Sequence, residues 1–246
     1  MAFDMPQPVH TPRSERFRAA VLAGLAAPQK AVPPLFFYDD RGSELFESIK
    51  SSDDYYVTRA ETAALLGAVG TLARIDAGAL VELGAGTGRR LEILLRSLPG
   101  LRAFCPVDLS IVQLALSEGD AADSGRRIAI APLLADFAEP FVLPPDVPGP
   151  RLAYFPGSSI GNFQPLGAQR LLSQLRASLG AGSQLLICVD LLKDARRLER
   201  AYDDRSGHTA AFNLNLLRRI NRELDGAFAL ENFGHEARFN LEQGRI

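Results

Sequence analysis

A glycine-rich stretch that directly follows a short apolar run constrains this chain most. Residues 79–83 are the apolar run expected of a buried parallel strand. Gly84, Gly86 and Gly88 follow at alternate positions, and leucines then recur at helical spacing over residues 91–98. Strand, glycine turn and helix form the βα unit that binds nucleotide-like ligands, because glycine lets the backbone approach the ligand. The alternative is an ordinary glycine-rich turn.

The spacing of the glycines narrows the choice of ligand. They follow the pattern G-x-G-x-G, and Arg89 stands where the dinucleotide fingerprint G-x-G-x-x-G needs its third glycine. An adenosyl ligand without a pyrophosphate, S-adenosylmethionine (SAM) above all, therefore fits better. Asp108 ends the next predicted strand, 20 residues after Gly88, where an acidic residue that holds ribose hydroxyls is expected. Asp108 could instead cap the following helix, and the two roles are compatible.

Strand and helix patterns alternate from about residue 60, as a parallel α/β sheet requires. The predicted strands are residues 79–83, 101–109, 128–134, 152–155 and 184–190. Polar or glycine-rich sequence follows them at Gly84–Gly88, Asp108, Asp136 and Gly157–Asn162. Ligands of such sheets bind at the carboxyl ends of the strands, so we expect these segments to share one site.

Helical periodicity also appears on both sides of the predicted sheet. The predicted helices include residues 15–26 with Ser14 as cap, a helix bearing Leu45, Phe46 and Ile49, and residues 60–75, 193–202 and 213–224. Arg218, Arg219 and Arg222 surround the last helix, which favours a solvated or salt-bridged face over a binding patch. Residues 238–246 are expected to form a strand and a turn.

Composition excludes several classes of function. The chain has 246 residues with 27 basic and 29 acidic side chains, so its net charge of −2 makes no case for nucleic acid or an anionic membrane. His10, His208 and His235 are far apart in sequence and predict no metal cluster. Cys105 and Cys188 fall in predicted buried strands and are expected to be inert thiols. No apolar run reaches membrane-spanning length, and the first residues are not a secretory signal, so we expect a cytoplasmic protein.

Seven segments point to a known family. They are FFYDDRGSELFESI (36–49), YYVTRAE (55–61), VELGAGTGRR (81–90), PVDLS (106–110), FPGSSIGNF (155–163), VDLLKD (189–194) and AYDDRSGHTAAFNLNLLRRINREL (201–224). Together they resemble the histidine-specific SAM-dependent methyltransferases, which make Nα,N,N-trimethylhistidine (hercynine) for ergothioneine synthesis. The resemblance implies a Rossmann-like class I methyltransferase sheet over residues 60–192. It also implies a second, smaller α+β substrate domain from residues 1–59 plus 193–246, in a monomer that acts on free L-histidine.

The resemblance also implies the site. Residues matching the family's SAM contacts are Gly84, Arg90, Asp108, Asp136 and Phe137, and the family usually has Lys where this chain has Arg90. Residues matching its contacts to the amino-acid head of histidine are Tyr55, Asn162 and Tyr202, with Tyr38 and Gly157 lining the same site. Methyl transfer to a neutral amine needs neither a covalent nucleophile nor a metal, and neither is predicted.

Three alternatives remain open. Members of this family continue for several dozen residues past the position of Ile246, and that part supplies the residues that contact the imidazole ring of histidine. The chain could therefore be a truncated, inactive SAM-binding fragment. It could also methylate a different amino-acid-like substrate. A nicotinamide oxidoreductase on the same sheet is disfavoured by Arg89.

Overall fold

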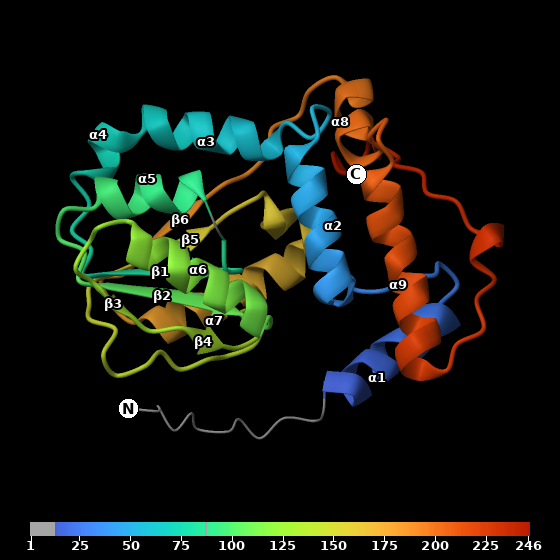
Figure 1. The fold of residues 1–246 in the computed structure, drawn as a ribbon, viewed down its shortest axis with the longest axis horizontal. Helices are drawn as coiled ribbons and strands as arrows, with labels where there is room; N and C mark the ends of the chain where they lie inside the picture. The colour runs from blue at the N-terminus through green and yellow to red at the C-terminus, as the bar shows by residue number, and fades with distance from the viewer. Residues whose placement is uncertain (1–12, 87) are drawn as a thin grey trace. The chain divides into compact units, whose positions relative to one another are not determined.

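A computed structural model describes residues 13–86 and 88–246 (Figure 1). These residues divide into two compact units. The larger unit comprises Asp53–Ala201 and Phe239–Ile246, and the smaller comprises the chain up to Ser52 together with Tyr202–Arg238. Residues 1–12, which the sequence analysis assigns to the smaller domain, lie outside the described part. The functional division into a donor domain and a substrate domain stays a prediction.

A parallel sheet forms the centre of the larger unit. Its strands are β1 (Ala79–Leu83), β2 (Ala103–Asp108), β3 (Ala129–Ile130), β4 (Leu133–Leu134), β5 (Arg151–Phe155) and β6 (Gln184–Ile187). Their order is β3-β2-β1-β5-β6, and every pair is parallel. Strand β4 also pairs with β2, nearer the carboxyl end of β2 than β3 does. The predicted α/β class with a Rossmann-like sheet is confirmed.

The strand order reverses at β1, which pairs with β2 on one side and β5 on the other. Glu82 of β1 lies opposite Tyr154 of β5, one residue before each strand ends. The loops that follow these two strands therefore emerge side by side at the carboxyl edge. This is the switch point at which open α/β sheets bind their ligands.

Helices cover both faces of this sheet (Figure 1). They are α3 (Val57–Gly67), α4 (Val69–Leu72), α5 (Arg89–Ser97), α6 (Ile111–Asp123), the 3-10 helix η2 (Ser159–Asn162) and α7 (Pro165–Leu179). After β6 the chain continues into α8 (Ala195–Tyr202). Leu65 of α3, Leu94 of α5 and Ala121 of α6 pack with Leu80 on one face. On the other face, α7 inserts its apolar stripe of Leu171, Leu175 and Leu179. Alternate strand residues serve the two cores, as strand pleating requires.

Several predicted elements of the larger unit differ in the structure, and the strand predicted over 184–190 ends at Ile187. The sequence predicts one strand over 128–134, but Pro132 has no N–H to donate, so the ladder breaks into β3 and β4. The helix predicted over 60–75 is the pair α3 and α4, separated at Ala68. Residues 238–246 form no strand: a single bridge joins Asn240 and Arg245 across a turn.

The last residues belong to the larger unit, whereas the sequence analysis assigns residues 193–246 to the smaller one. Two contacts give the reason. The backbone N–H of Phe239 donates to Glu199 Oε1 at 3.1 Å, and the Arg245 guanidinium donates to the carbonyl of Gly161 at 2.6 Å. These bonds tie both ends of the segment to α8 and to the loop after β5.

The described part of the smaller unit contains helices rather than the predicted α+β arrangement. They are α1 (Arg13–Ala26), η1 (Pro34–Phe37), α2 (Asp40–Ser51), α9 (His208–Leu224) and η3 (Leu230–Asn232). Phe17, Phe36 and Ile220 meet in its core. Ser14 lies inside α1 rather than capping it. Asp39 caps α2 through the Gly42 N–H and also accepts from Asn215 Nδ2 at 2.7 Å, which joins α2 to α9.

Helix α9 differs from its prediction in length and in one arginine. It begins at His208 rather than 213, because the Asp204 carboxylate accepts from the N–H groups of His208 and Thr209. The predicted arginine face is salt-bridged at Arg219, which pairs with Glu223 at 3.1 Å, but Arg219 is buried rather than solvated. It donates to the Phe36 carbonyl at 2.9 Å and lies over the Phe17 ring. None of the helices within the described residues is long and apolar enough to cross a membrane.

Candidate functional site

The glycine loop leaves β1 at the switch point and leads into α5. The N–H of Gly84 donates to the Val107 carbonyl at 2.8 Å, so the loop begins as an extension of the sheet. Gly84 has φ of +81°, a conformation that L side chains rarely adopt. A Cβ at this position would lie 3.7 Å from the ring of Phe137. The structure thus brings together Gly84 and Phe137, two of the residues predicted to contact SAM.

Asp108 closes the loop from the neighbouring strand. One carboxylate oxygen accepts from the Ala85 N–H at 2.8 Å and the other accepts from the Ser110 N–H at 2.7 Å. Ser110 is the N-cap of α6, because its hydroxyl accepts from the Gln113 N–H. The alternative role of Asp108 as that N-cap is therefore wrong. Its carboxylate lies beside the glycine loop, as a ribose contact would require.

Glu82 is the second carboxylate at this loop, and it is fully buried beneath it. Its Oε1 would lie 2.6 Å from a Cβ at Gly86, so only glycine leaves room there without a shift. Within the described residues, Oε2 is buried and has no hydrogen-bond partner. Burial raises the pKa of Glu82 to about 7, against the Gly86 N–H and the charge of Arg90, which lower it. An unsatisfied buried carboxylate oxygen under a glycine turn suits a ligand that carries positive charge.

Asp136 and Phe137 follow β4 on the same edge. The Asp136 carboxylate accepts from the Ala138 N–H at 3.0 Å, which tightens the turn, and Asp136 is half-buried. The Phe137 ring packs edge-on against Phe155, the last residue of β5, with the ring centroids 5.6 Å apart. This contact holds the ring over Gly84, where it could cover one side of a bound ligand.

Arg90 belongs to a buried polar cluster centred on Glu61 of α3. The Arg90 guanidinium forms an ion pair with Glu61 Oε2, and the two side chains are 12% and 2% exposed. Burial lowers the pKa of Arg90, but the charge of Glu61, its hydrogen bond to Arg90 and the charges of Tyr154 and Glu82 together outweigh burial and raise the pKa. Glu61 Oε1 also accepts from the Tyr154 hydroxyl at 2.7 Å and from the Gly157 N–H at 3.2 Å. Arg90 and Gly157, predicted for SAM and for substrate, are therefore linked through one carboxylate.

The loop after β5 carries Gly157 and Asn162. Gly157 has φ of +70° and Ser158 of +58°, so two successive left-handed residues turn the chain sharply into η2. Asn162 is exposed at the end of η2. Arg245 donates to the carbonyls on either side of it, those of Gly161 and Phe163, at 2.6 and 3.0 Å. The Asn162 side chain is thus presented on a braced segment.

The two tyrosines that precede α3 are both buried. Tyr55, predicted to bind the substrate, is 5% exposed. Tyr56 donates its hydroxyl to Asp190, three residues past the end of β6, and Lys193 donates to the same carboxylate at 2.5 Å. Burial, and then Asp190, raise the pKa of Tyr56, so it stays a hydrogen-bond donor. This bond anchors the start of α3 to the last strand.

Tyr38 and Tyr202 are described within the smaller unit. The Tyr38 ring packs against Phe46 and Phe212, with centroids 5.4 and 5.3 Å away. The carbonyl of Tyr202 accepts from His235 Nε2 at 2.7 Å. Their assignment to the substrate stays a prediction.

The two cysteines have the environments of unreactive thiols. Cys105 is buried in β2, and burial raises its pKa to about 12. Cys188 lies just past β6 and is only half-buried, in contrast to the buried strand position predicted for it. Burial and a hydrogen bond to Glu61 raise its pKa to about 12 as well.

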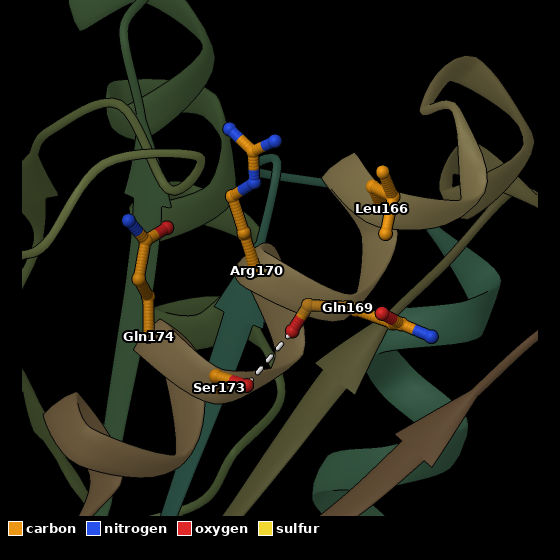
Figure 2. Close-up of a pocket in the computed structure, with 5 residues that line it drawn as sticks. All are labelled: Leu166, Gln169, Arg170, Ser173 and Gln174. Carbon is orange, nitrogen blue, oxygen red and sulfur yellow. Dashed lines mark hydrogen bonds between the residues drawn. The ribbon is translucent and has the colours of Figure 1, made fainter.

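A shallow surface depression lies along α7 (Figure 2). Its lining residues are Leu166, Gln169, Arg170, Ser173 and Gln174. All five come from one helix, and the Ser173 hydroxyl is engaged with the Gln169 carbonyl at 2.9 Å. No residue from a strand end contributes to this lining, so we place the candidate site at the glycine loop.

Sequence reasoning assigned no role to Glu61, Tyr154 or the orphan oxygen of Glu82. The sequence does contain a pattern that could have identified Glu61 as a buried, paired carboxylate. Val57, Glu61 and Leu65 are four residues apart, so a carboxylate sits in the middle of an apolar helix stripe, and all three are buried. A charged residue in such a stripe requires a buried partner. The partners come from α5 and β5, which sequence spacing cannot reveal.

The comparisons with known proteins agree with this geometry. A model of the family "Histidine-specific methyltransferase, SAM-dependent" matches residues 17–246. The histidine N-alpha-methyltransferase of Mycolicibacterium smegmatis is 41% identical over 95% of this chain and 74% of its own length. That of Mycobacterium tuberculosis is 40% identical over 93% of this chain and 72% of its own. The N-methyltransferase fsqC of Aspergillus fumigatus is 31% identical over 91% of this chain and 63% of its own length. The chain belongs to the SAM-dependent, histidine-specific methyltransferase family.

Proposed function

We propose that the protein transfers methyl groups from SAM to the α-amino nitrogen of L-histidine, giving Nα,N,N-trimethylhistidine. The observation that carries the proposal is the carboxylate oxygen of Glu82 that lies buried under a glycine loop at the switch point and has no hydrogen-bond partner among the described residues. SAM carries a sulfonium and an ammonium, so it supplies the positive charge that this oxygen lacks. A dinucleotide would bring a pyrophosphate, which a buried carboxylate disfavours.

The donor contacts are proposed for residues around that loop. When bound, SAM supplies an electrophilic methyl group. Asp108 is suited to accept from ribose hydroxyls, because its carboxylate already lies beside the Ala85 N–H. Phe137 is suited to cover one side of the ligand over Gly84. Arg90 has donors beyond the one it gives to Glu61 and could bind a carboxylate. Asp136 holds the turn that presents Phe137.

The substrate contacts are proposed for the loop after β5 and its neighbours. Asn162 is suited to donate to the carboxylate of histidine, and Tyr55 to accept from its amino group. Gly157 leaves room for the amino-acid head beside the glycine loop. Tyr38 and Tyr202, in the smaller unit, are assigned to histidine from the family resemblance alone. The main task of these residues is to hold the amine in line with the methyl group at about 3 Å.

A second candidate is N-methylation of another amino-acid-like amine. The observation that favours it is the 31% identity with an N-methyltransferase whose name does not mention histidine. A SAM-binding role without turnover is a third candidate. We further propose that the protein acts as a monomer in the cytoplasm without nucleic acid or membrane partners.

One experiment separates the candidates. The purified protein is incubated with SAM and each of a panel of amino acids, and products are identified by mass spectrometry. Trimethylated histidine, formed with a kcat/KM at least about tenfold above that for any other amino acid, supports the proposal. A stronger preference for another amine supports the second candidate. Donor binding in a calorimeter without any methylated product supports the third.

A further inference from the structure

Glu61 is a buried carboxylate for which the proposed chemistry has no role of its own. It sits on α3 and is 3% exposed, yet its bonds reach four other segments of the larger unit, one of which is the chain just past β6 that carries Cys188. Arg90 comes from α5, Tyr154 from β5, and Gly157 from the loop after β5. The N–H of Gly157 lies within 3.3 Å of both carboxylate oxygens.

The bonds to Glu61 join two segments that are proposed to hold different ligands. Arg90 lies in the first turn of α5, directly after the glycine loop, on the donor side. Gly157 opens the loop that ends at Asn162, on the substrate side. Because β1 and β5 are neighbours, these segments emerge side by side. Methyl transfer requires the two ligands to be placed accurately against each other, since small displacements of reacting atoms strongly reduce rate.

The charge of Glu61 cannot be removed without consequence for these segments. An arginine that is 12% exposed would lose its ion-pair partner, and the desolvation of its charge would favour a different, more solvated rotamer. Arg90 also lies near Glu82, which would become its nearest acidic alternative. A glutamine at this position has one acceptor oxygen, which can face either Arg90 or the Gly157 N–H and the Tyr154 hydroxyl, so one of the two sides would lose its acceptor.

We propose that Glu61 is a positioning residue that holds Arg90 and the Gly157 loop in fixed register, and thereby aligns donor and acceptor. This inference rests on the proposed function. Glu61 touches neither ligand in it. Its effect is transmitted through Arg90 to donor binding and through Gly157 to binding of the amino acid.

The test uses Glu61→Gln, with Glu92→Gln as the matched control. Glu92 is on α5, its side chain is 43% exposed, and it forms an ion pair with Arg96 one turn later on the same helix. Affinity for S-adenosylhomocysteine is measured by calorimetry, and kcat and KM for histidine by initial rates. Glu61→Gln is expected to weaken S-adenosylhomocysteine binding at least about tenfold, as loss of a charged hydrogen bond implies. Its KM for histidine should rise at least about fivefold, while Glu92→Gln stays within about twofold in both.

A purely structural role gives a different result. The folded fraction would then bind both ligands with wild-type constants, and only the number of calorimetric sites would fall, which overturns the inference. If Glu61→Gln does not fold, Glu61→Asp carries the test. Arg90 is long and can follow the retracted carboxylate, whereas the Gly157 backbone cannot. S-adenosylhomocysteine affinity should then stay within about threefold and KM for histidine should rise at least about fivefold; wild-type values of both overturn the inference.

Failure of the proposed function is recognised in the wild-type protein. If it methylates another amine and not histidine, the proposed function fails, and the same variants are compared with that amine. If it does not bind S-adenosylhomocysteine at all, both the proposed function and the role of Glu61 are overturned.

Discussion

The Asp108 carboxylate accepts a hydrogen bond from the Ala85 N–H at 2.8 Å, which ties the end of β2 to the middle of the glycine loop. One side chain therefore shapes the loop and borders the space above it. A substitution of Asp108 therefore changes both the bond that shapes the glycine loop and the carboxylate proposed to hold the ribose.

Asp108→Ala is expected to weaken SAM binding by roughly 1.5–3 kcal/mol, the scale of a hydrogen bond to a charged group. Calorimetry with S-adenosylhomocysteine measures the change. Asp123→Ala is the control, because Asp123 is exposed at the end of α6. Unchanged affinity in a folded Asp108→Ala protein would remove Asp108 from the donor site.

Asn162→Ala is expected to raise the KM for histidine while donor affinity stays within about twofold, roughly under 0.5 kcal/mol. The reason is its exposed position on the substrate loop, which Arg245 braces through backbone carbonyls rather than through the Asn162 side chain. Gln169→Ala, on the outer face of α7, should change neither value. Equal losses for donor and histidine would show that Asn162 is not specific to the substrate.

Glu82→Gln is expected to stabilise the ligand-free protein at alkaline pH. The pKa of Glu82 is about 7 in the folded protein against 4.5 in the unfolded chain, so the folded state holds the proton more tightly. Its stabilising contribution is full below about pH 4.5 and is lost as pH rises through about 7.

Urea unfolding at pH 5 and pH 8 tests this directly. The unfolding free energy of Glu82→Gln relative to wild type should grow by about 2–3 kcal/mol between the two. Glu92→Gln should show no such trend, since the Glu92 side chain is 43% exposed and pairs with Arg96 at the surface of α5. A constant difference for Glu82→Gln would mean that Glu82 is ionised in the folded protein at both values.

Gly84→Ala and Gly119→Ala should shift stability in opposite directions. Gly84 has φ of +81°, where an alanine is strained by roughly 1–2 kcal/mol. Gly119 lies inside α6, with open space around its Cβ position, so alanine should stabilise the helix by roughly 0.5–1 kcal/mol. Thermal melting of both variants measures the pair. A Gly84→Ala protein as stable as wild type would contradict the strain at the loop.

The order of residues along the chain predicted those elements whose bounds depend on neighbouring residues, and it did not predict contacts between distant segments. The strand at residues 79–83 was predicted with its observed bounds, because its apolar run ends at Gly84. The break between β3 and β4 at Pro132 could also have been predicted, since proline has no N–H to donate to a neighbouring strand. The apolar run around Pro132 instead suggested one strand. The burial of Arg219 was not readable, because its partners Phe36 and Phe17 lie far away in sequence.

The candidate site divides in the same way. The glycine loop and Asp108 follow from spacing along the chain, and the structure brings them together. The pairing of Arg90 with Glu61 depends on how α3 packs against α5, and that is decided by tertiary contacts. The orphan oxygen of Glu82 is a property of its surroundings and has no sequence signature.

The smaller unit is assembled from two stretches of chain separated by most of the larger unit. The bond from Arg219 to the Phe36 carbonyl spans 183 positions. During synthesis from the N-terminus, α1, η1 and α2 therefore emerge long before α9. Phe17 of α1 and Phe36 of η1 stay without their packing partners on α9 until that helix has been made. Contacts between residues far apart in sequence form slowly, and the apolar surface they will bury stays exposed to aggregation until they form. A nascent chain of this protein should need chaperone protection chiefly at its first two helices.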